Sequence, residues 1–170
     1  VSLAPDGAFA AVTMSDRIKR MLDIWVWDLA RRVRTRFTSS GDVGLPTWSP
    51  DGKYIVFRAN RHGSADLYQK AADGAGDEQL LWKDALTKHP TNWSADGRFI
   101  LYYTGVSTVQ TGSDIWALPL FGARKPFPIL KRAFEEQNAT LSPDGRWMAY
   151  TSTESGQTEL FVSGFPRLNG

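Results

Sequence analysis

Hydrophobic residues along this chain gather in short runs that return in a fixed order. One kind of run mixes aromatic and aliphatic residues and occurs at residues 8–13, 54–59, 99–104 and 147–152. A second kind starts with an acidic residue and continues with aromatic or aliphatic residues, at residues 23–29, 66–71, 114–120 and 159–164. Runs this short and this rich in aromatic and β-branched residues predict buried strands rather than helices.

Weaker runs complete a unit of four strands. A third apolar stretch follows at residues 34–38, 78–83 and 127–131, and a short lead-in occurs at residues 46–49, 90–94 and 138–142. We therefore predict that each unit has four strands, A to D. In the first unit strand A is reduced to residues 1–3, and in the last unit no strand D is predicted after strand C.

The same short turn joins strands A and B in every unit. It reads LAPDG at residues 3–7, WSPDG at 48–52, WSADG at 93–97 and LSPDG at 141–145, and its aspartates stand 45, 45 and 48 residues apart. Proline suits the second position of a type I turn, aspartate can bond its own backbone, and glycine takes the left-handed position that completes the hairpin. A four-stranded unit that repeats at this interval is typical of a β-propeller blade, whose apolar faces are buried by neighbouring blades.

The predicted fold is an all-β, partial β-propeller ring of about four blades. We expect a single propeller domain or fragment over residues 1–170, with blades near residues 1–38, 39–83, 84–131 and 132–170, the first and last incomplete. One segment permits another interpretation, because Ile18, Met21, Leu22 and Trp25 have helical spacing. A helical turn there is the alternative to the long B–C loop, running into a strand at Asp23, that the repeat register favours.

Composition narrows the classes of function. The chain has no cysteine, so neither a disulfide nor a thiolate metal site can form. No apolar run is long enough for a membrane span, and we expect no membrane insertion by this segment. The net charge of +2 is too small to predict a nucleic-acid partner. The chain begins with valine rather than methionine, which suggests a processed or truncated fragment.

The repeat resembles the TolB-type, WD40-like β-propeller repeats known as PD40 repeats. Residues 45–81, LPTWSPDGKYIVFRANRHGSADLYQKAADGAGDEQLL, follow that family's pattern almost position by position. Among such propellers, its sequence looks most like those attached to bacterial serine/threonine protein kinases. The resemblance implies a sensory or interaction module, periplasmic or otherwise outside the cytoplasm, whose partner is a protein or a small ligand. Similar propellers also cap prolyl-oligopeptidase-type enzymes.

The resemblance also bears on assembly, since TolB-type rings usually have more blades than four. We expect the chain to be a piece of a longer protein. Two alternatives remain. The chain could pair with a copy of itself as a homodimer through open blade edges, or it could close as a four-bladed ring.

No catalytic motif is present in the sequence. It lacks a G-x-S-x-G nucleophile elbow, a Walker A loop and the protein-kinase motifs. We expect a non-catalytic interaction or ligand-sensing module with no cofactor and no metal. The alternatives are the propeller portion of a prolyl-oligopeptidase-like hydrolase, or a self-assembling propeller fragment.

Variable loops are where we expect binding. The stereotyped PDG turns at one end of the blades are interpreted as structure, whereas the B–C and D–A loops at the other end vary. These loops span residues 14–22, 61–65 and 105–113, and residues 39–45, 84–89 and 133–137. The candidate binding residues on them are Arg17, Lys19, Arg20, His62, His89 and Gln137.

Each candidate also has a simpler interpretation. The two histidines lack the spacing of a metal site and would then be ordinary loop residues. The basic residues alternate with acids such as Asp16 and Asp23 and would form a solvated rim. Tryptophans that share a repeat position, such as Trp48 and Trp93, are interpreted as packing between blades.

Overall fold

The fold consists of β strands. The computed structural model describes residues 1–16, 21–39, 41–61, 63–105 and 112–165. No helix occurs in these ranges, and all strand pairs that are described are antiparallel. The all-β, propeller-type prediction is confirmed. The helical alternative is wrong for the residues that the structure describes here, because Asp16 ends strand β2 and Met21 begins strand β3. Residues 17–20 lie outside the described residues.

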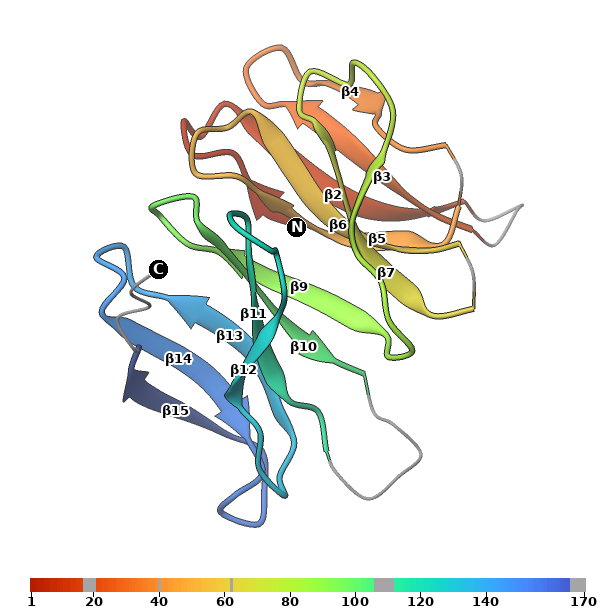
Figure 1. Ribbon diagram of the computed structural model, residues 1–170. Helices are drawn as coiled ribbons and strands as arrows, with labels where there is room; N and C mark the ends of the chain where they lie inside the picture. The colour runs from red at the N-terminus through yellow and green to blue at the C-terminus, as the bar shows by residue number, and fades with distance from the viewer. Residues whose placement is uncertain (17–20, 40, 62, 106–111, 166–170) are drawn as a thin grey trace. The chain divides into compact units, whose positions relative to one another are not determined.

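The strands form four sheets, and within each sheet the neighbouring strands are also consecutive along the chain (Figure 1). The first sheet contains β1 (Ser2–Leu3), β2 (Phe9–Asp16), β3 (Met21–Asp28) and β4 (Val33–Arg36). The second contains β5 (Val43–Trp48), β6 (Tyr54–Asn60), β7 (Ala65–Ala71) and β8 (Gln79–Trp82). The third contains β9 (Lys88–Trp93), β10 (Phe99–Thr104), β11 (Ile115–Pro119) and β12 (Phe127–Leu130). The fourth contains β13 (Glu136–Leu141), β14 (Trp147–Ser152) and β15 (Glu159–Gly164). These are the strands expected of units A to D, including the two-residue stub at the start.

The chain divides into two compact units, Val1–Pro90 and Thr91–Gly170. The first holds the first two sheets and the opening residues of β9, and the second holds the rest of the third sheet and the fourth. Each unit is described below by itself. That all four blades form a single propeller domain stays a prediction.

The four PDG turns have the geometry that their sequence predicts. In each, the glycine N–H donates to the carbonyl three residues earlier, over 2.8–3.0 Å, and the glycine φ lies between 66° and 74°. In the last three turns the serine hydroxyl donates to the aspartate, and it accepts the N–H of the first residue of the next strand. Each turn is therefore closed by its own side chains as well as by its backbone.

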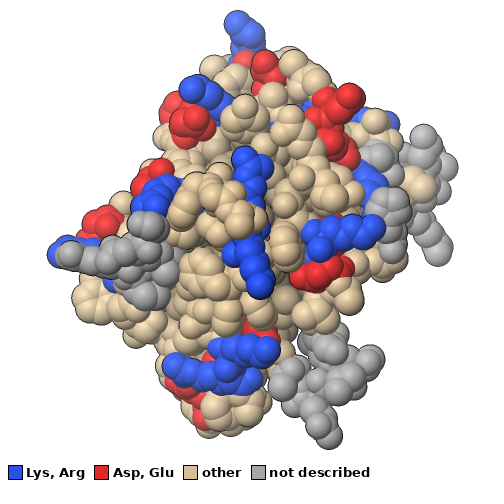
Figure 2. Space-filling model, viewed as in Figure 1, with Lys and Arg blue, Asp and Glu red and all other residues tan. Residues whose placement is uncertain are grey.

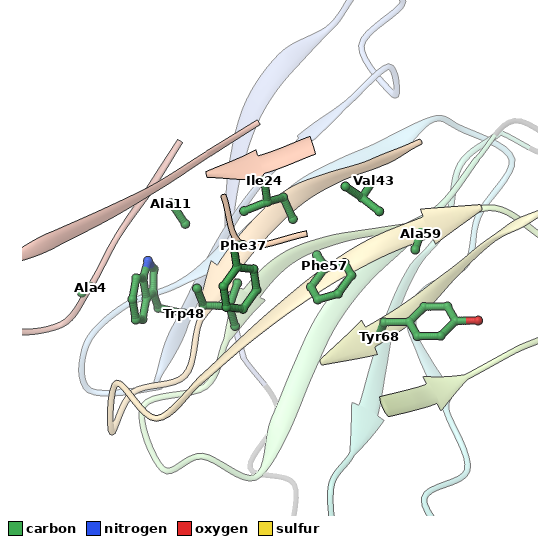
Figure 3. Packing of buried hydrophobic residues seen from close by; sticks show 10 residues of the cluster. Ala4, Ala11, Ile24, Phe37, Val43, Trp48, Phe57, Ala59 and Tyr68 are labelled. Carbon is green, nitrogen blue, oxygen red and sulfur yellow. The ribbon is translucent and has the colours of Figure 1, made fainter. Parts of the chain in front are cut away.

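In the first unit, two sheets pack face to face around one apolar cluster (Figure 3). The first sheet and the segment after it contribute Ala11, Ile24 and Phe37, and the second contributes residues such as Trp48 and Phe57. The Trp48 indole Nε1 donates to the Ser2 carbonyl over 3.1 Å, so this tryptophan pins the short β1 to the second sheet. The interpretation of Trp48 as packing between blades is confirmed.

In the second unit, a comparable cluster joins the third and fourth sheets. Phe99, Leu101 and Ile115 from the third sheet pack with Met148 and Tyr150 from the fourth. Leucine, isoleucine and aromatic side chains buried in this way each stabilise a fold by about 1.5–3 kcal/mol. Neighbouring sheets therefore bury each other's apolar faces within each unit, as the blade prediction requires.

Strand ends extend further into the predicted loops than the sequence indicates. The β2–β3 hairpin pairs as far as Asp16 with Met21, so the predicted loop at residues 14–22 is mostly strand. Strands β5, β9 and β13 begin at Val43, Lys88 and Glu136, inside the predicted D–A loops. Two of these strands carry a register shift, between Gly44 and Thr47 in β5 and between Gln137 and Thr140 in β13. A bulge breaks the two-residue alternation that reveals a strand in a sequence.

Candidate functional site

The predicted site residues divide into those the structure describes and those it does not. Arg17, Lys19, Arg20 and His62 lie outside the described residues. His89 lies in β9 and Gln137 in β13. Both occupy the second position of their A strand, yet they belong to different units, so each is considered with its own neighbours.

His89 lies beside Arg58 at the loop end of the second sheet. The Arg58 Nη1 and the His89 Nδ1 are 3.5 Å apart, and both residues are half-buried. Burial and the neighbouring guanidinium charge lower the pKa of His89 to about 4. The imidazole is therefore neutral at physiological pH, and the cation at this position is the arginine.

Lys88, the residue before His89, is fully buried and holds the D–A connection in place. Its ammonium donates to Asp66 Oδ1 over 2.9 Å and to the backbone carbonyls of Asp84 and Leu86, and it lies 2.8 Å from Asp84 Oδ1. Asp66 is also fully buried. A buried ammonium is tolerated because oxygens surround it, and the cluster rigidly fixes residues 84–88.

A shallow open hollow of about 640 Å³ lies at this loop end, and its lining residues are Gly63, Ser64, Lys83, Asp84, Ala85 and Thr87. Asp84 joins several of the surrounding residues: its carbonyl accepts a hydrogen bond from the Ser64 hydroxyl, and its carboxylate accepts one from the Trp82 indole N–H. Burial raises the pKa of Asp84, but the hydrogen bonds from Lys88, the Leu86 N–H and Trp82 outweigh burial and hold the pKa below its usual value. Asp84 is therefore an anion at neutral pH.

A second cleft, of about 570 Å³, lies at the opposite end of the first unit, where sequence reasoning predicted only structural turns. Its lining comes from the turns of both sheets and from apolar side chains beneath them: Ala4, Pro5, Asp6, Phe9, Val26, Asp28, Arg31, Val33, Thr35, Arg36, Phe37, Trp48, Pro50, Asp51, Gly52, Ala72, Asp73 and Gly74. Its rim carries charges of both signs, and Arg31 and Arg36 are each paired with an aspartate. No periodic signal could have found this cleft, because it arises from the stacking of two sheets.

In the second unit, Gln137 bonds across the seam between two sheets. Its Nε2 donates to Ser113 Oγ over 3.0 Å, and the Glu136 N–H donates to the Ser113 carbonyl over 2.7 Å. Asp114 and Glu136, the chain neighbours of Ser113 and Gln137, are both buried. The side chain of Gln137 therefore serves the seam between β11 and β13.

In the described part of the chain, no group of three or more histidine, cysteine, aspartate or glutamate residues is placed to hold a metal ion. The same part of the chain contains no helix with the length and hydrophobicity that crossing a bilayer requires. Figure 2 shows Lys and Arg interspersed with Asp and Glu on the visible face, in small groups of both signs.

Comparison with known proteins assigns the repeat. The model of the TolB β-propeller domain, PD40, matches residues 2–165. The chain belongs to this family. The repeated PDG turn and the four-stranded sheets are thus those of a TolB-type propeller.

Individual TolB proteins are similar over nearly all of this propeller chain. The Tol-Pal system protein TolB of Francisella tularensis subsp. tularensis is 25% identical over 155 residues, which cover 91% of this chain and 35% of that protein. The crystal structure of TolB from Acinetobacter baumannii has a TM-score of 0.79 at 21% identity and covers 96% of this chain and 40% of that one. The chain therefore spans less than half the length of these TolB proteins.

The TolB-type fold is also shared with propellers of other proteins. A structure from a study of two prolyl endopeptidases matches with a TM-score of 0.60 at 17% identity, covering 95% of this chain and 27% of that one. At this identity the likeness concerns the fold alone. The likeness to kinase-attached propellers stays a prediction.

Proposed function

We propose that this TolB-type propeller is a non-catalytic protein-interaction module and that it binds its partner through the loop-rich end of its sheets. The fold favours protein interaction in general, and the observation that carries the choice of surface is the buried Lys88 cluster. The cluster fixes the D–A connection at residues 84–88, so the exposed residues around it are presented on a rigid support. A binding surface that is already ordered loses little entropy on association.

The polar groups at this end suit a protein partner. Arg58 supplies a cation beside the neutral His89, and Asp84 supplies an anion at the neighbouring hollow. Arg17, Lys19, Arg20 and His62 lie outside the described residues, and Gln137 belongs to the second unit, so their part in binding stays a prediction from the sequence.

The partner that we propose for the whole protein is a protein outside the cytoplasm. The Francisella relative is named as a component of the Tol-Pal system, and family membership makes a comparable role the leading hypothesis for the longer protein. Recognition would then use preformed loops with little movement of the sheets.

Site-specific photo-cross-linking tests the proposed surface. A benzophenone amino acid is placed at Ala85, in the loop-end hollow, or at Ala75, in the turn at the opposite end of the same sheet; both alanines are exposed. In the native organism, we expect irradiation to give an adduct with a specific protein from Ala85 and none from Ala75. Adducts confined to Ala75 would overturn the choice of surface. Absence of protein adducts at both positions would argue against the interaction function itself.

The alternative function is the propeller part of a prolyl-oligopeptidase-like hydrolase. The fold likeness to prolyl endopeptidases supports it. The deciding observation is the coding sequence that follows Gly170 in the gene. An α/β-hydrolase domain with a G-x-S-x-G elbow there would favour the enzyme.

A further inference from the structure

In the first three sheets, the acid at the start of the C strand is buried and needs a positive partner. Asp23, Asp66 and Asp114 occupy this position in the first three sheets, and none of them is more than 6% exposed. Asp23 is paired with the guanidinium of Arg36 and Asp66 with the ammonium of Lys88. The aspartate at this repeat position is thus paired with a different cation in each of the first two sheets, Arg36 of β4 or Lys88 of β9.

At Asp114 of the third sheet, an acid from the next sheet takes the place of that cation. Lys88 stands six residues before the turn serine Ser94, and Glu136 stands six residues before the corresponding serine, Ser142. Glu136 is fully buried, like Lys88. Strand β9 brings an ammonium to the aspartate of the second sheet, whereas β13 brings a second carboxyl group toward Asp114 of the third sheet, close enough for the two charges to interact.

The two carboxyl groups are held in place and poorly solvated. Among the described residues, Asp114 Oδ1 and both carboxyl oxygens of Glu136 have no hydrogen-bond partner. The backbone at Gly112 lies very close to the backbone at Phe134: a Cβ added to Gly112 would be 2.5 Å from the Phe134 carbonyl oxygen. The Glu136 N–H bond to Ser113 ties the two segments together beside the pair.

The charges around the pair are only partly opposite. Arg132 Nε lies 3.6 Å from Glu136 Oε1, but Arg132 is half-exposed and its Nη1 binds Glu154 at 2.7 Å. Burial raises the pKa of Glu136, Arg132 opposes that rise, and the charges of Asp114 and Glu154 add to it. Burial likewise raises the pKa of Asp114, against the opposing charge of Lys131.

We infer that Asp114 and Glu136 form a proton-dependent latch, which takes up a proton on acidification and thereby tightens the seam between the third and fourth sheets at their loop-rich end. A protonated carboxyl group can donate a hydrogen bond to the ionised one, whereas two buried anions repel. Both groups have a folded-state pKa above the unfolded value of about 4. Their stabilising contribution is therefore complete below that value and is lost as the pH rises through the folded-state pKa.

Urea unfolding of the intact chain from pH 4.5 to pH 8 tests the latch, with Glu136→Gln as the variant and Glu135→Gln as its control. Glu135 is exposed, so its substitution removes one acid without touching the pair. The low pKa of His89 adds a rise in stability between about pH 4 and pH 6.5 that all three proteins share, so the variants are compared with the wild type at each pH. We expect the difference between Glu135→Gln and the wild type to stay constant with pH. Glu136→Gln is expected to gain stability relative to the wild type as the pH rises and to have a higher midpoint at pH 8. Equal slopes in all three proteins would overturn the inference.

Two further measurements keep the test decisive. Glu136→Lys places a lysine opposite Asp114, as Lys88 is placed opposite Asp66. Relative to the wild type, its stability is expected to rise with pH, because Asp114 must ionise to pair with the lysine. If Glu136→Lys does not fold, Asp114→Asn takes its place and is expected to reduce the dependence of stability on pH. Hydrogen exchange, corrected for its intrinsic pH dependence, should slow on acidification at residues 113–116 and 134–137 more than at residues 141–147. If millimolar calcium chloride stabilises the wild type at pH 8 but not Glu136→Gln, the pair holds a metal ion instead of a proton and the latch is wrong.

Discussion

At the scale of single residues, the PDG turns were predictable because their chemistry is local. Proline, aspartate and glycine act within a few residues of one another, and the structure shows the expected bonds in all four turns. Residues whose partners are remote were not predictable. Lys88 falls in a predicted loop, and nothing near it in the sequence indicates that it is buried against Asp66, 22 residues away.

The left-handed turn glycine allows a matched test at this scale. Gly145 has a φ of +66°, in the left-handed region, whereas Gly164 is not among the glycines with positive φ. At both positions an added Cβ would meet no atom within 4 Å. Gly145→Ala should therefore destabilise the chain by about 1–2 kcal/mol through backbone conformation alone. Gly164→Ala should be neutral or stabilising by about 0.5 kcal/mol. Thermal unfolding of both variants measures the difference, and an equal effect would show that φ is not the cause.

The buried ion pair gives a stronger prediction. Lys88→Met removes the ammonium and leaves Asp66 buried without its cation, which should destabilise the fold by about 3–5 kcal/mol. The double variant Lys88→Met/Asp66→Leu should recover much of that loss, because neither charge then remains. Urea unfolding of the single and double variants measures the coupling. A double variant as unstable as the sum of the two singles would contradict the pairing.

At the scale of elements, strand centres were predictable and strand ends were not. Apolar runs marked the centres of β6, β10 and β14, whose observed bounds agree with the prediction to within one residue. The starts of β5 and β13 were missed because their bulges place Leu45 and Asn138 at positive φ, which interrupts the alternation. Pairing of β2 with β3 likewise overrides the helical spacing around Met21, because the cross-strand ladder extends to that residue.

The candidate site shows the same limit. The repeat register placed His89 and Gln137 on D–A loops, whereas both are the second residue of a strand, β9 or β13. Their partners Arg58 and Ser113 come from neighbouring sheets. The turn-end cleft was missed altogether, since its walls are assembled from segments distant in sequence. Sequence therefore identified the repeating framework, and the contacts between repeats had to come from the structure.

At the scale of the whole molecule, the fourth sheet exposes an apolar surface. Trp147, Leu160 and Val162 are 53%, 71% and 65% exposed. Pairing of Ala149 with Val162 and of Thr151 with Leu160 places these side chains on one face, opposite the face that sends Met148 and Tyr150 into the core. Elsewhere in this chain an apolar sheet face packs against another sheet, so we expect this one to acquire a partner sheet as well.

For the isolated chain, the partner that we predict is a second copy. Light scattering with size-exclusion chromatography should show a mass that rises with protein concentration, and Leu160→Lys/Val162→Lys should reduce that rise because charges on the face oppose its burial. Leu80→Lys is the control, since Leu80 is also half-exposed but lies on the outer strand β8 of the second sheet. A mass that does not change with concentration would contradict self-association. If Leu80→Lys disperses the protein and the fourth-sheet variant does not, the contact lies on the outer strand of the second sheet instead.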